Sequence, residues 1–338
     1  PIEENDRWWG KGFTEWTNVT KARPLFQGHY QPQLPADLGF YDLRSPQTQL
    51  DQANLAHDYG LHGFCYYYYW FDGKKVLNEP IEKMLQSGSP NFPFCVCWAN
   101  ENWSRNWDGQ NKHVLLEQHY SEESNRSLIQ EFIRLMRDER YIRHNGKPVL
   151  LVYRIRIIPN WLQTAEMWRE ECRKAGIGEI HLCAVRFGLE PLEGQPADFG
   201  LDSFVIYPPH ESEKVDARSS VRDLAQDFNG TIFDYDSAMI ADLQRFDDAY
   251  PWPVHRGVML GWDNTARRQR DSRIFLGSTP ARLHRWLKGI VSQENRHNKN
   301  PESLVFVNAW NEWAEGTMLE PSVKFGRGYL DALRAVVG

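Results

Sequence analysis

The chain has 338 residues, of which 39 are Lys or Arg and 45 are Asp or Glu, so its formal net charge is −6. A chain of this length, with 41% apolar residues, can bury a large core. Its negative charge argues against a nucleic-acid-binding protein, and no apolar run approaches the ~18 residues of a membrane span. We therefore expect a single domain over residues 1–338, with no nucleic-acid partner and no membrane span.

In chain order, seven runs rich in apolar and aromatic residues predict strands over residues 62–70, 93–100, 148–154, 180–187, 203–207, 255–262 and 304–310. The runs are continuous, which is typical of strands buried on both faces. Amphipathic segments between them predict helices over residues 48–59, 122–137, 161–175 and 280–294, with Ser45 and Ser121 as N-caps of the first two. This alternation predicts an α/β fold with a parallel sheet. Because polar motifs follow several strands and no Gly-rich phosphate-binding turn occurs, we expect a (β/α) barrel and not an open doubly wound sheet.

The cysteines and the first residues bear on cofactors and location. Five cysteines are an odd number and too few for a disulfide framework, so we expect buried, reduced thiols. No His/Cys grouping has zinc spacing, and we expect neither a metal nor another cofactor. The first residues lack a signal-peptide pattern, which slightly favours a cytoplasmic location, although the chain is compatible with being part of a longer gene product with further domains.

Aromatic residues gather beside amides and acids just after the predicted strands. The fourteen Trp and fourteen Tyr exceed what an ordinary core needs, and their flat faces and polar edges suit stacking on sugar rings. The densest motif covers residues 98–109, and a packing role for it is the alternative. We expect a carbohydrate site at the carboxyl ends of the strands, with substrate bound by Trp98, Asn100, Glu101, Tyr153, Trp262, Asp263, Trp310 and Asn311.

Two carboxylates, Glu312 and Glu315, follow the last predicted strand. Glycoside hydrolysis needs such a pair, one group to protonate the leaving oxygen and the other to act on the opposite side of the sugar. Trp310 and Trp313 would partly desolvate one carboxyl and raise its pKa, as a general acid requires. By spacing alone, a helix N-terminus with glutamates in its first turn is an equally good interpretation.

Longer motifs carry a resemblance to a known family. The segments are WWGKGFTEWTNV at residues 8–19, GFCYYYYW at 63–70 and WANENW at 98–103. They resemble the WbsX-type proteins, relatives of glycoside hydrolase family 99 found in bacterial polysaccharide gene clusters, and the resemblance covers essentially the whole chain. Residues 311–317, NEWAEGT, are similar to the Asn-Glu-Trp-His-Glu-Gly-Thr segment of the family 99 endo-α-mannosidases, with Ala314 in place of His. Residues 262–265, WDNT, are similar to the Tyr-Asp-Asp-Thr segment of the same family, with Trp262 in place of Tyr.

The resemblance implies a (β/α)8 barrel that cleaves α-mannosides with retention and without a metal. It implies that Glu312 is the base that deprotonates the sugar 2-hydroxyl and that Glu315 is the general acid/base. Relatives usually carry one strand immediately before the segment that matches Pro1, so the resemblance also implies that the first strand of the barrel is missing from this chain.

Three functions remain open at this point. The leading hypothesis is a retaining glycoside hydrolase acting on a polysaccharide or oligosaccharide. The alternative is a glycosyltransferase of bacterial surface polysaccharide biosynthesis, and Asp234-Tyr235-Asp236 literally matches the Asp-x-Asp pattern of metal-dependent transferases. The third is a sugar-binding barrel without catalysis.

Overall fold

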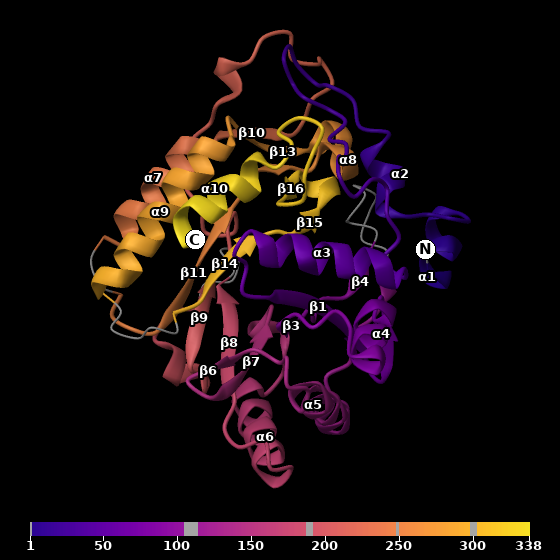
Figure 1. Ribbon diagram of the computed structural model, residues 1–338, viewed down its shortest axis with the longest axis vertical. Helices are drawn as coiled ribbons and strands as arrows, with labels where there is room; N and C mark the ends of the chain where they lie inside the picture. Colours follow the sequence, from indigo (N-terminus) through magenta and orange to yellow (C-terminus); the bar gives the residue numbers. More distant parts are fainter. Residues whose placement is uncertain (1, 105–113, 187–191, 248–249, 298–302) are drawn as a thin grey trace.

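The computed structural model describes residues 2–104, 114–186, 192–247, 250–297 and 303–338. Its central feature is a curled sheet with the strand order β2-β1-β3-β7-β8-β9-β11-β14 (Figure 1). Seven strands of this sheet pair in parallel: β1 (Phe64–Phe71), β3 (Phe94–Trp98), β7 (Lys147–Val152), β8 (His181–Arg186), β9 (Ser203–Ile206), β11 (Val254–Met259) and β14 (Val305–Asn308). The short strands β2 (Lys74–Val76) and β6 (Arg143–His144) pair antiparallel with β1 and β7.

These seven strands confirm the seven that the apolar runs predict, and most are a few residues shorter. The largest difference concerns Trp262, which does not extend β11. Instead it begins β12 (Trp262–Asp263), which pairs antiparallel with β13 (Arg273–Leu276) in a separate small sheet with β10 (Thr231–Asp234). Residue 187, at the end of one predicted strand, lies outside the described residues.

The parallel sheet is curled but open. The parallel strands end at β14 on one side and at β1 on the other, where β2 pairs only with Tyr69–Phe71, and within the described residues no strand joins β1 to β14. The closed eight-stranded barrel is therefore not confirmed, and the additional first strand stays a prediction. One consequence is that Cys65, in β1, is exposed, whereas Cys95, Cys97, Cys172 and Cys183 are buried as expected. The expectation that all five thiols are buried was wrong for this edge position.

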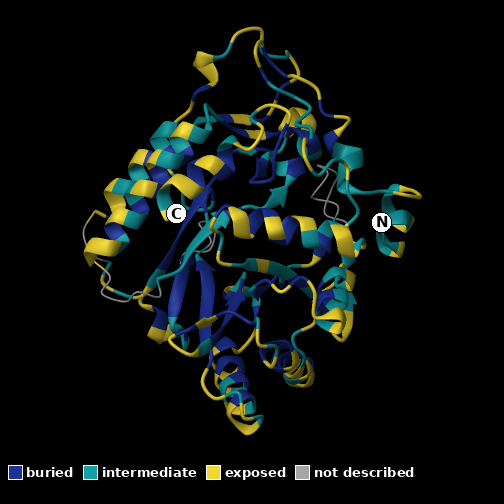
Figure 2. Cartoon of the chain, viewed as in Figure 1, coloured by how far each residue is buried: buried dark blue, intermediate teal, exposed yellow. Residues whose placement is uncertain are grey.

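Helices cover the outer face of the sheet (Figure 2). Those of nine or more residues are α3 (Pro46–Asp58), α4 (Glu79–Ser87), α5 (Glu122–Met136), α6 (Trp161–Lys174), α7 (Tyr235–Arg245), α9 (Pro280–His297) and α10 (Gly328–Val337). The shorter α1 (Glu3–Trp9) has no buried residue and lies to the side of the sheet, at the N-terminus (Figure 1). The predicted caps are present, because Ser45 accepts a hydrogen bond from the Thr48 amide and Ser121 accepts one from the Ser124 amide. Among the described residues, none of the helices is both long and apolar enough to cross a membrane.

Two large apolar clusters fix the helices to the sheet. In one, Phe132 of α5 and Trp168 of α6 are fully buried against β3, β7 and β8. In the other, Trp286 of α9 and Tyr235 of α7 pack on Val258 of β11. The first cluster includes consecutive residues of β3, β7 and β8, so both faces of these strands are packed with apolar side chains.

Short elements form a layer above the carboxyl ends of the strands. They are α2 (Glu15–Val19), α8 (Thr265–Arg268), the 3-10 turn η6 (Trp313–Glu315), the paired strands β15 (Asn311–Glu312) and β16 (Thr317–Met318), and the paired strands β4 (Trp103–Ser104) and β5 (Val114–Leu116). Val19 of α2, Ala266 of α8 and Trp313 of η6 share one apolar cluster. This packing brings the N-terminal segment against the segment that holds the predicted catalytic glutamates.

Candidate active site at the carboxyl ends of the strands

The predicted motifs follow parallel strands, so the structure places them at one end of the sheet. Contacts between strands confirm their proximity. The Tyr67 hydroxyl donates to the Tyr207 hydroxyl at 2.7 Å, and Tyr207 donates to the Asn308 side chain at 3.1 Å. The Tyr153 hydroxyl lies 2.7 Å from Nε2 of His210. The part of the densest motif that covers residues 105–109 lies outside the described residues.

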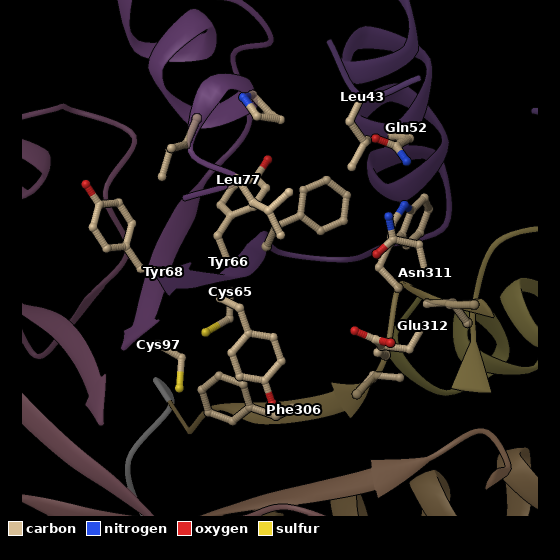
Figure 3. Close-up of a pocket in the computed structure, with 18 of the residues that line it drawn as sticks. Leu43, Gln52, Cys65, Tyr66, Tyr68, Leu77, Cys97, Phe306, Asn311 and Glu312 are labelled. Atoms are coloured by element: carbon tan, nitrogen blue, oxygen red, sulfur yellow. The ribbon is translucent and has the colours of Figure 1, made fainter. Parts of the chain in front are cut away.

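A cavity of about 830 Å³ opens at this end and continues between the two edge strands. Its walls are largely aromatic and apolar, with a few polar groups. Figure 3 shows Asn311 and Glu312 on one wall, with Cys65 and Cys97 across the cavity from Glu312. Tyr67, Tyr69, Tyr207, Trp310 and Trp313 also line it. Its volume and aromatic walls suit a ligand the size of a sugar.

Glu312 belongs to a group of four charged residues that we call the Arg267 cluster: Glu15, Arg267, Glu312 and Glu315. One guanidinium nitrogen of Arg267 lies 2.9 Å from Glu15 and 2.8 Å from Glu312. The other lies 2.6 Å from Glu315. The side chain of Arg267 is 9% exposed, whereas those of Glu312 and Glu315 are 24% and 23% exposed. The two carboxylates are therefore more accessible than the guanidinium that holds them.

Local structure explains how the cluster assembles. Arg267 is in α8, directly after β12, and Glu15 begins α2, where it also accepts a hydrogen bond from the Ala314 amide at 2.9 Å. Gly316, with φ +64°, ends η6, and a Cβ there would lie 2.8 Å from the Asp263 carbonyl oxygen. Only glycine combines this backbone conformation with so close an approach, so Gly316 permits η6 to pack on β12.

The charges of the cluster do not cancel. One guanidinium and three carboxylates give a formal charge of 1 − 3 = −2 when all are ionised. Burial raises the pKa of Glu312, Arg267 lowers it in part, and the neighbouring charges of Glu15 and Glu315 raise it further. Burial likewise raises the pKa of Glu315 against the effect of Arg267. A site of this kind can hold a proton at neutral pH and exchange it, which is what general acid–base chemistry requires.

Asp263, which the sequence predicts to bind substrate, does not join this cluster. It accepts hydrogen bonds from Gln31 at 2.7 Å and from the Thr265 hydroxyl at 2.5 Å, and it lies 2.8 Å from Nε2 of His29. Burial alone would raise the pKa of Asp263, but these hydrogen bonds outweigh burial and lower it. Asp263 therefore holds the N-terminal segment against β12, next to the half-buried Trp262.

Three other predicted binding residues have structural contacts. Trp98 is 1% exposed and packs against Trp168 of the helix layer, so its indole cannot stack on a ligand. Asn100 is fully buried and bonds both backbone groups of Arg154, at 2.7 and 2.8 Å. Glu101 accepts from the Arg154 guanidinium at 2.5 Å. Trp98 faces the helix layer because side chains alternate between the two faces of a strand. The sugar-binding roles predicted for Trp98 and Asn100 are therefore not part of the function proposed below.

The remaining predicted binding residues lie at the cavity or beside it. Trp310 and Asn311 line the cavity, and Asn311 donates to the Tyr41 hydroxyl at 3.0 Å. That hydroxyl donates in turn to Glu320 at 2.8 Å. Tyr153 is half-buried between Tyr67 and Tyr207, at the same end of the sheet.

Sequence reasoning missed Arg267, Glu15, Glu320 and the tyrosines Tyr69 and Tyr207 as site residues. Glu15 belongs to the first motif that carries the family resemblance, at residues 8–19. Arg267 lies five residues after Trp262, a predicted binding residue, so each lies in or near a motif that the sequence analysis identified. Their pairing with Glu312 was not predictable, because it depends on how α2 and α8 pack. Burial raises the pKa of Tyr69, and the nearby Glu312 raises it further, so this phenol is neutral beside the cluster.

Metal-binding geometry occurs elsewhere in the described part of the chain. Its one group of three or more metal-ligating side chains within reach of a single ion is His144, His181 and His255, at the other end of the strands. In the Arg267 cluster the positive charge comes from a guanidinium.

Two solved structures are similar to this chain in fold. A glycoside hydrolase-like protein aligns with a TM-score of 0.61 and 14% identity, over 90% of this chain and 89% of its own. The family 99 endo-α-mannosidase of Bacteroides thetaiotaomicron, in complex with bis-tris-propane, aligns with a TM-score of 0.54 and 14% identity, over 90% and 87%. At this identity the likeness defines the fold.

The chain belongs to the family described as Glycosyltransferase WbsX, whose model matches residues 1–333. It is 45% identical over 337 residues to WxcX, an uncharacterized protein of Xanthomonas campestris pv. campestris strain B100, and 44% identical to the WxcX of strain ATCC 33913. Each match covers 99% of this chain and 47% of the relative. The chain thus spans about half the length of the curated relatives it matches.

Proposed function

We propose that the chain is a retaining glycoside hydrolase of the family 99-like type that acts on a polysaccharide or oligosaccharide. The observation that carries this proposal is the Arg267 cluster, in which Glu312 and Glu315 share one guanidinium at an aromatic cavity. Two carboxyls at such a position match what glycosidic cleavage needs. The fold likeness to a family 99 endo-α-mannosidase and the similar Asn-Glu-Trp-x-Glu-Gly-Thr segment support the same chemistry.

In the proposed reaction Glu312 removes the proton of the sugar 2-hydroxyl, and the resulting oxygen attacks the anomeric carbon. The bond to the leaving oxygen breaks as Glu315 protonates that oxygen. Glu315 then deprotonates water, which opens the 1,2-anhydro sugar, while Glu312 returns a proton to the 2-oxygen. Two inversions at the anomeric carbon give net retention.

Arg267 and Glu15 complete the proposed site without touching the reacting bond. Arg267 offsets the negative charge of Glu312 and Glu315, and Glu15 holds the same guanidinium nitrogen that Glu312 contacts. Tyr69, Trp310 and Asn311 line the same cavity and are the residues that we assign to sugar binding there. The structural neighbour's endo-α-mannosidase title makes α-mannosides the first substrates to test.

Screening a panel of defined oligosaccharides, α-mannosides included, tests this proposal. Wild type should release product with retained anomeric configuration, and Glu312→Gln and Glu315→Gln should each lose about 10²–10⁴-fold in rate. The matched control is Glu179→Gln, a glutamate in surface ion pairs with Arg169 and Arg173, which should keep full activity. Binding without product from any panel member would favour the sugar-binding barrel.

A glycosyltransferase is the second candidate, because the description of the family names that activity. The structure gives its literal Asp-x-Asp pattern other roles. Asp234 caps α7 by accepting from the Ser237 amide at 2.6 Å, and Asp236 pairs with Arg282 at 2.7 Å. Thermal shift with nucleotide sugars, with and without Mn²⁺, separates the two candidates. The hydrolase proposal expects no stabilisation by a nucleotide sugar, and a rise in Tm that needs both the nucleotide sugar and Mn²⁺ would favour the transferase.

A further inference from the structure

Three histidines meet at the end of the sheet opposite the Arg267 cluster. His181 is the first residue of β8, His255 is the second residue of β11, and His144 lies in β6 beside the start of β7. They are 6%, 5% and 8% exposed. Since the strands are parallel, their amino ends are far from the rim that carries Glu312. This group is therefore separate from the proposed active site.

The ring nitrogens are close enough to share one ion. One nitrogen of each ring lies within 4.8 Å of the others, and Nε2 of His181 lies 2.8 Å from Nε2 of His255. The ring of His144 is 4.4 Å from that of His181 and 5.1 Å from that of His255, between centroids. Tetrahedral zinc with Zn–N bonds of about 2.0–2.1 Å holds its ligand nitrogens roughly 3.4 Å apart. The spacings in the cluster, 2.8 Å for one pair and at most 4.8 Å for all, bracket that value.

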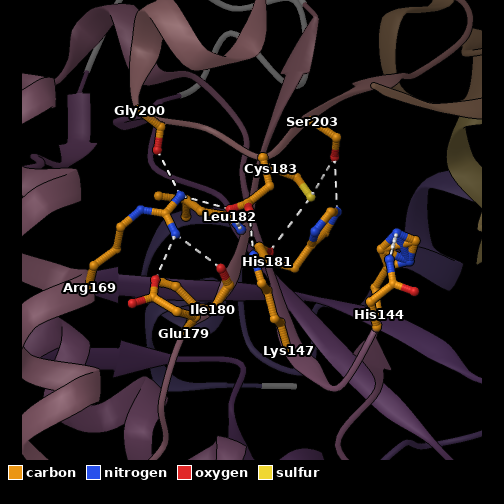
Figure 4. A network of polar contacts seen from close by, with 12 residues as sticks. His144, Lys147, Arg169, Glu179, Ile180, His181, Leu182, Cys183, Gly200 and Ser203 are labelled. Atoms are coloured by element: carbon orange, nitrogen blue, oxygen red, sulfur yellow. Dashed lines mark hydrogen bonds and ion pairs between the residues drawn. The ribbon is translucent and has the colours of Figure 1, made fainter. Parts of the chain in front are cut away.

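The chemical state of the rings suits ligation. All three rings are buried, and burial disfavours the charged imidazolium relative to the neutral imidazole. Neutral imidazole is the form that binds metals. Ser203 Oγ lies 3.1 Å from Nε2 of His181 and 3.1 Å from Cys183 Sγ, so a hydroxyl and a thiol border the rings (Figure 4).

The charged groups nearby compensate one another. Lys147 lies 3.1 Å from Asp202, and Arg169 lies 2.7 Å from the same carboxylate and 3.7 Å from Glu179 (Figure 4). Two cations and two anions leave little net charge to repel an added ion.

We propose that His144, His181 and His255 bind one zinc-class divalent cation that joins the amino ends of β7, β8 and β11. Imidazole ligands favour Zn²⁺ and other late first-row ions over Mg²⁺. No local spacing motif exists for this site, because its three ligands are 37 and 74 residues apart in the chain, and for that reason the sequence predicted no metal. The bound cation has a structural role, because it lies at the end of the strands opposite the proposed active site. The proposed cation site does not depend on the proposed glycoside chemistry.

Metal binding to untagged full chain tests the proposal. Titration with Co²⁺ should produce tetrahedral d–d absorption that saturates at one ion per chain, and Zn²⁺ should displace it. Zn²⁺ should also raise Tm, while Mg²⁺ at the same concentration should not. His181→Gln and His255→Gln should each weaken Zn²⁺ binding by at least about 100-fold in competition with a chelating indicator.

The control is His210→Gln, which removes a half-buried histidine at the opposite end of the strands and should leave the affinity unchanged. Wild-type protein that gives no saturable Co²⁺ spectrum would overturn the proposal even if the variants do not fold. Metal affinity that survives in both cluster variants, or that is lost in Glu312→Gln, would also overturn it.

Discussion

Arg267 is the residue on which the proposed active site depends, because three carboxylates converge on its guanidinium. Arg267→Gln leaves these carboxylates in a buried place without a cation, and removing one partner of a buried ion pair costs about 3–5 kcal/mol. The free energy of unfolding should fall by about that amount at pH 8. It should fall less at pH 5, because protonation relieves the repulsion.

Urea unfolding at the two pH values measures this effect. Arg270→Gln is the matched control, since Arg270 forms only an exposed pair with Asp227 and should lose at most about 1 kcal/mol. A loss in Arg267→Gln no larger than the control's, at both pH values, would contradict a charge-holding role for Arg267.

Glu320 makes a second residue-scale prediction, this time about pH. It is 2% exposed and accepts hydrogen bonds from Tyr41, Gln52 and Trp313, and burial raises its pKa to about 7. The folded state then binds this proton more tightly than the unfolded state. The stability it contributes is present below the unfolded pKa of about 4.3 and is lost as pH rises through about 7.

The difference in free energy of unfolding between wild type and Glu320→Gln isolates this group, since His210, whose pKa desolvation lowers to about 3, has the opposite pH dependence below pH 6.5. The free energy of unfolding of wild type should fall by up to about 1.4 kcal/mol per pH unit relative to that of Glu320→Gln. This fall should occur between the unfolded pKa of Glu320, about 4.3, and its folded pKa, about 7. A difference that stays constant from pH 5 to pH 8.5 would show that Glu320 ionises normally.

At the scale of elements, the turn η6 depends on Gly316. Gly316→Ala adds a Cβ 2.8 Å from a carbonyl oxygen, whereas Gly326→Ala has a similar positive φ of +53° and nothing within 4 Å. Both variants lose about 1–2 kcal/mol for the left-handed backbone, and only the first must also move η6 off β12. Gly316→Ala should therefore be the less stable variant and the less active one, and equal values of Tm and rate for the two would contradict the packing argument.

The element scale also shows how far the sequence could be interpreted. Continuous apolar runs located the parallel strands, because strands buried on both faces need them. The direction in which individual side chains point could not be predicted from these runs. Trp98, at the end of its strand, faces the helices, and Asn100 is hydrogen-bonded to the backbone of Arg154. Glu312 and Glu315 were visible as a local pair. Their partner Arg267 was not, because an ion pair across 45 residues has no local pattern.

At the scale of the whole molecule, the open edge between β1 and β14 makes one thiol different from the other four. Cys65 is exposed there, and the others are buried. A thiol-specific reagent should label native protein quickly at one site, and Cys65→Ser should remove that fast phase. If a further strand occupied this edge in a longer gene product, the same thiol would be protected. Several fast thiols, or a fast phase that persists in Cys65→Ser, would contradict the open edge.

The division of labour between Glu312 and Glu315 tests the central claim most directly. Rates of the two Gln variants are compared on substrates that have either a poor sugar leaving group or an activated aryl leaving group. Glu315→Gln should lose about 10²–10⁴-fold with the poor leaving group and keep the first step with the activated one, which needs little protonation. Glu312→Gln should lose activity on both, and a 2-O-methyl substrate should be inert with wild type. Rapid, retaining turnover of the 2-O-methyl substrate would contradict the proposed mechanism.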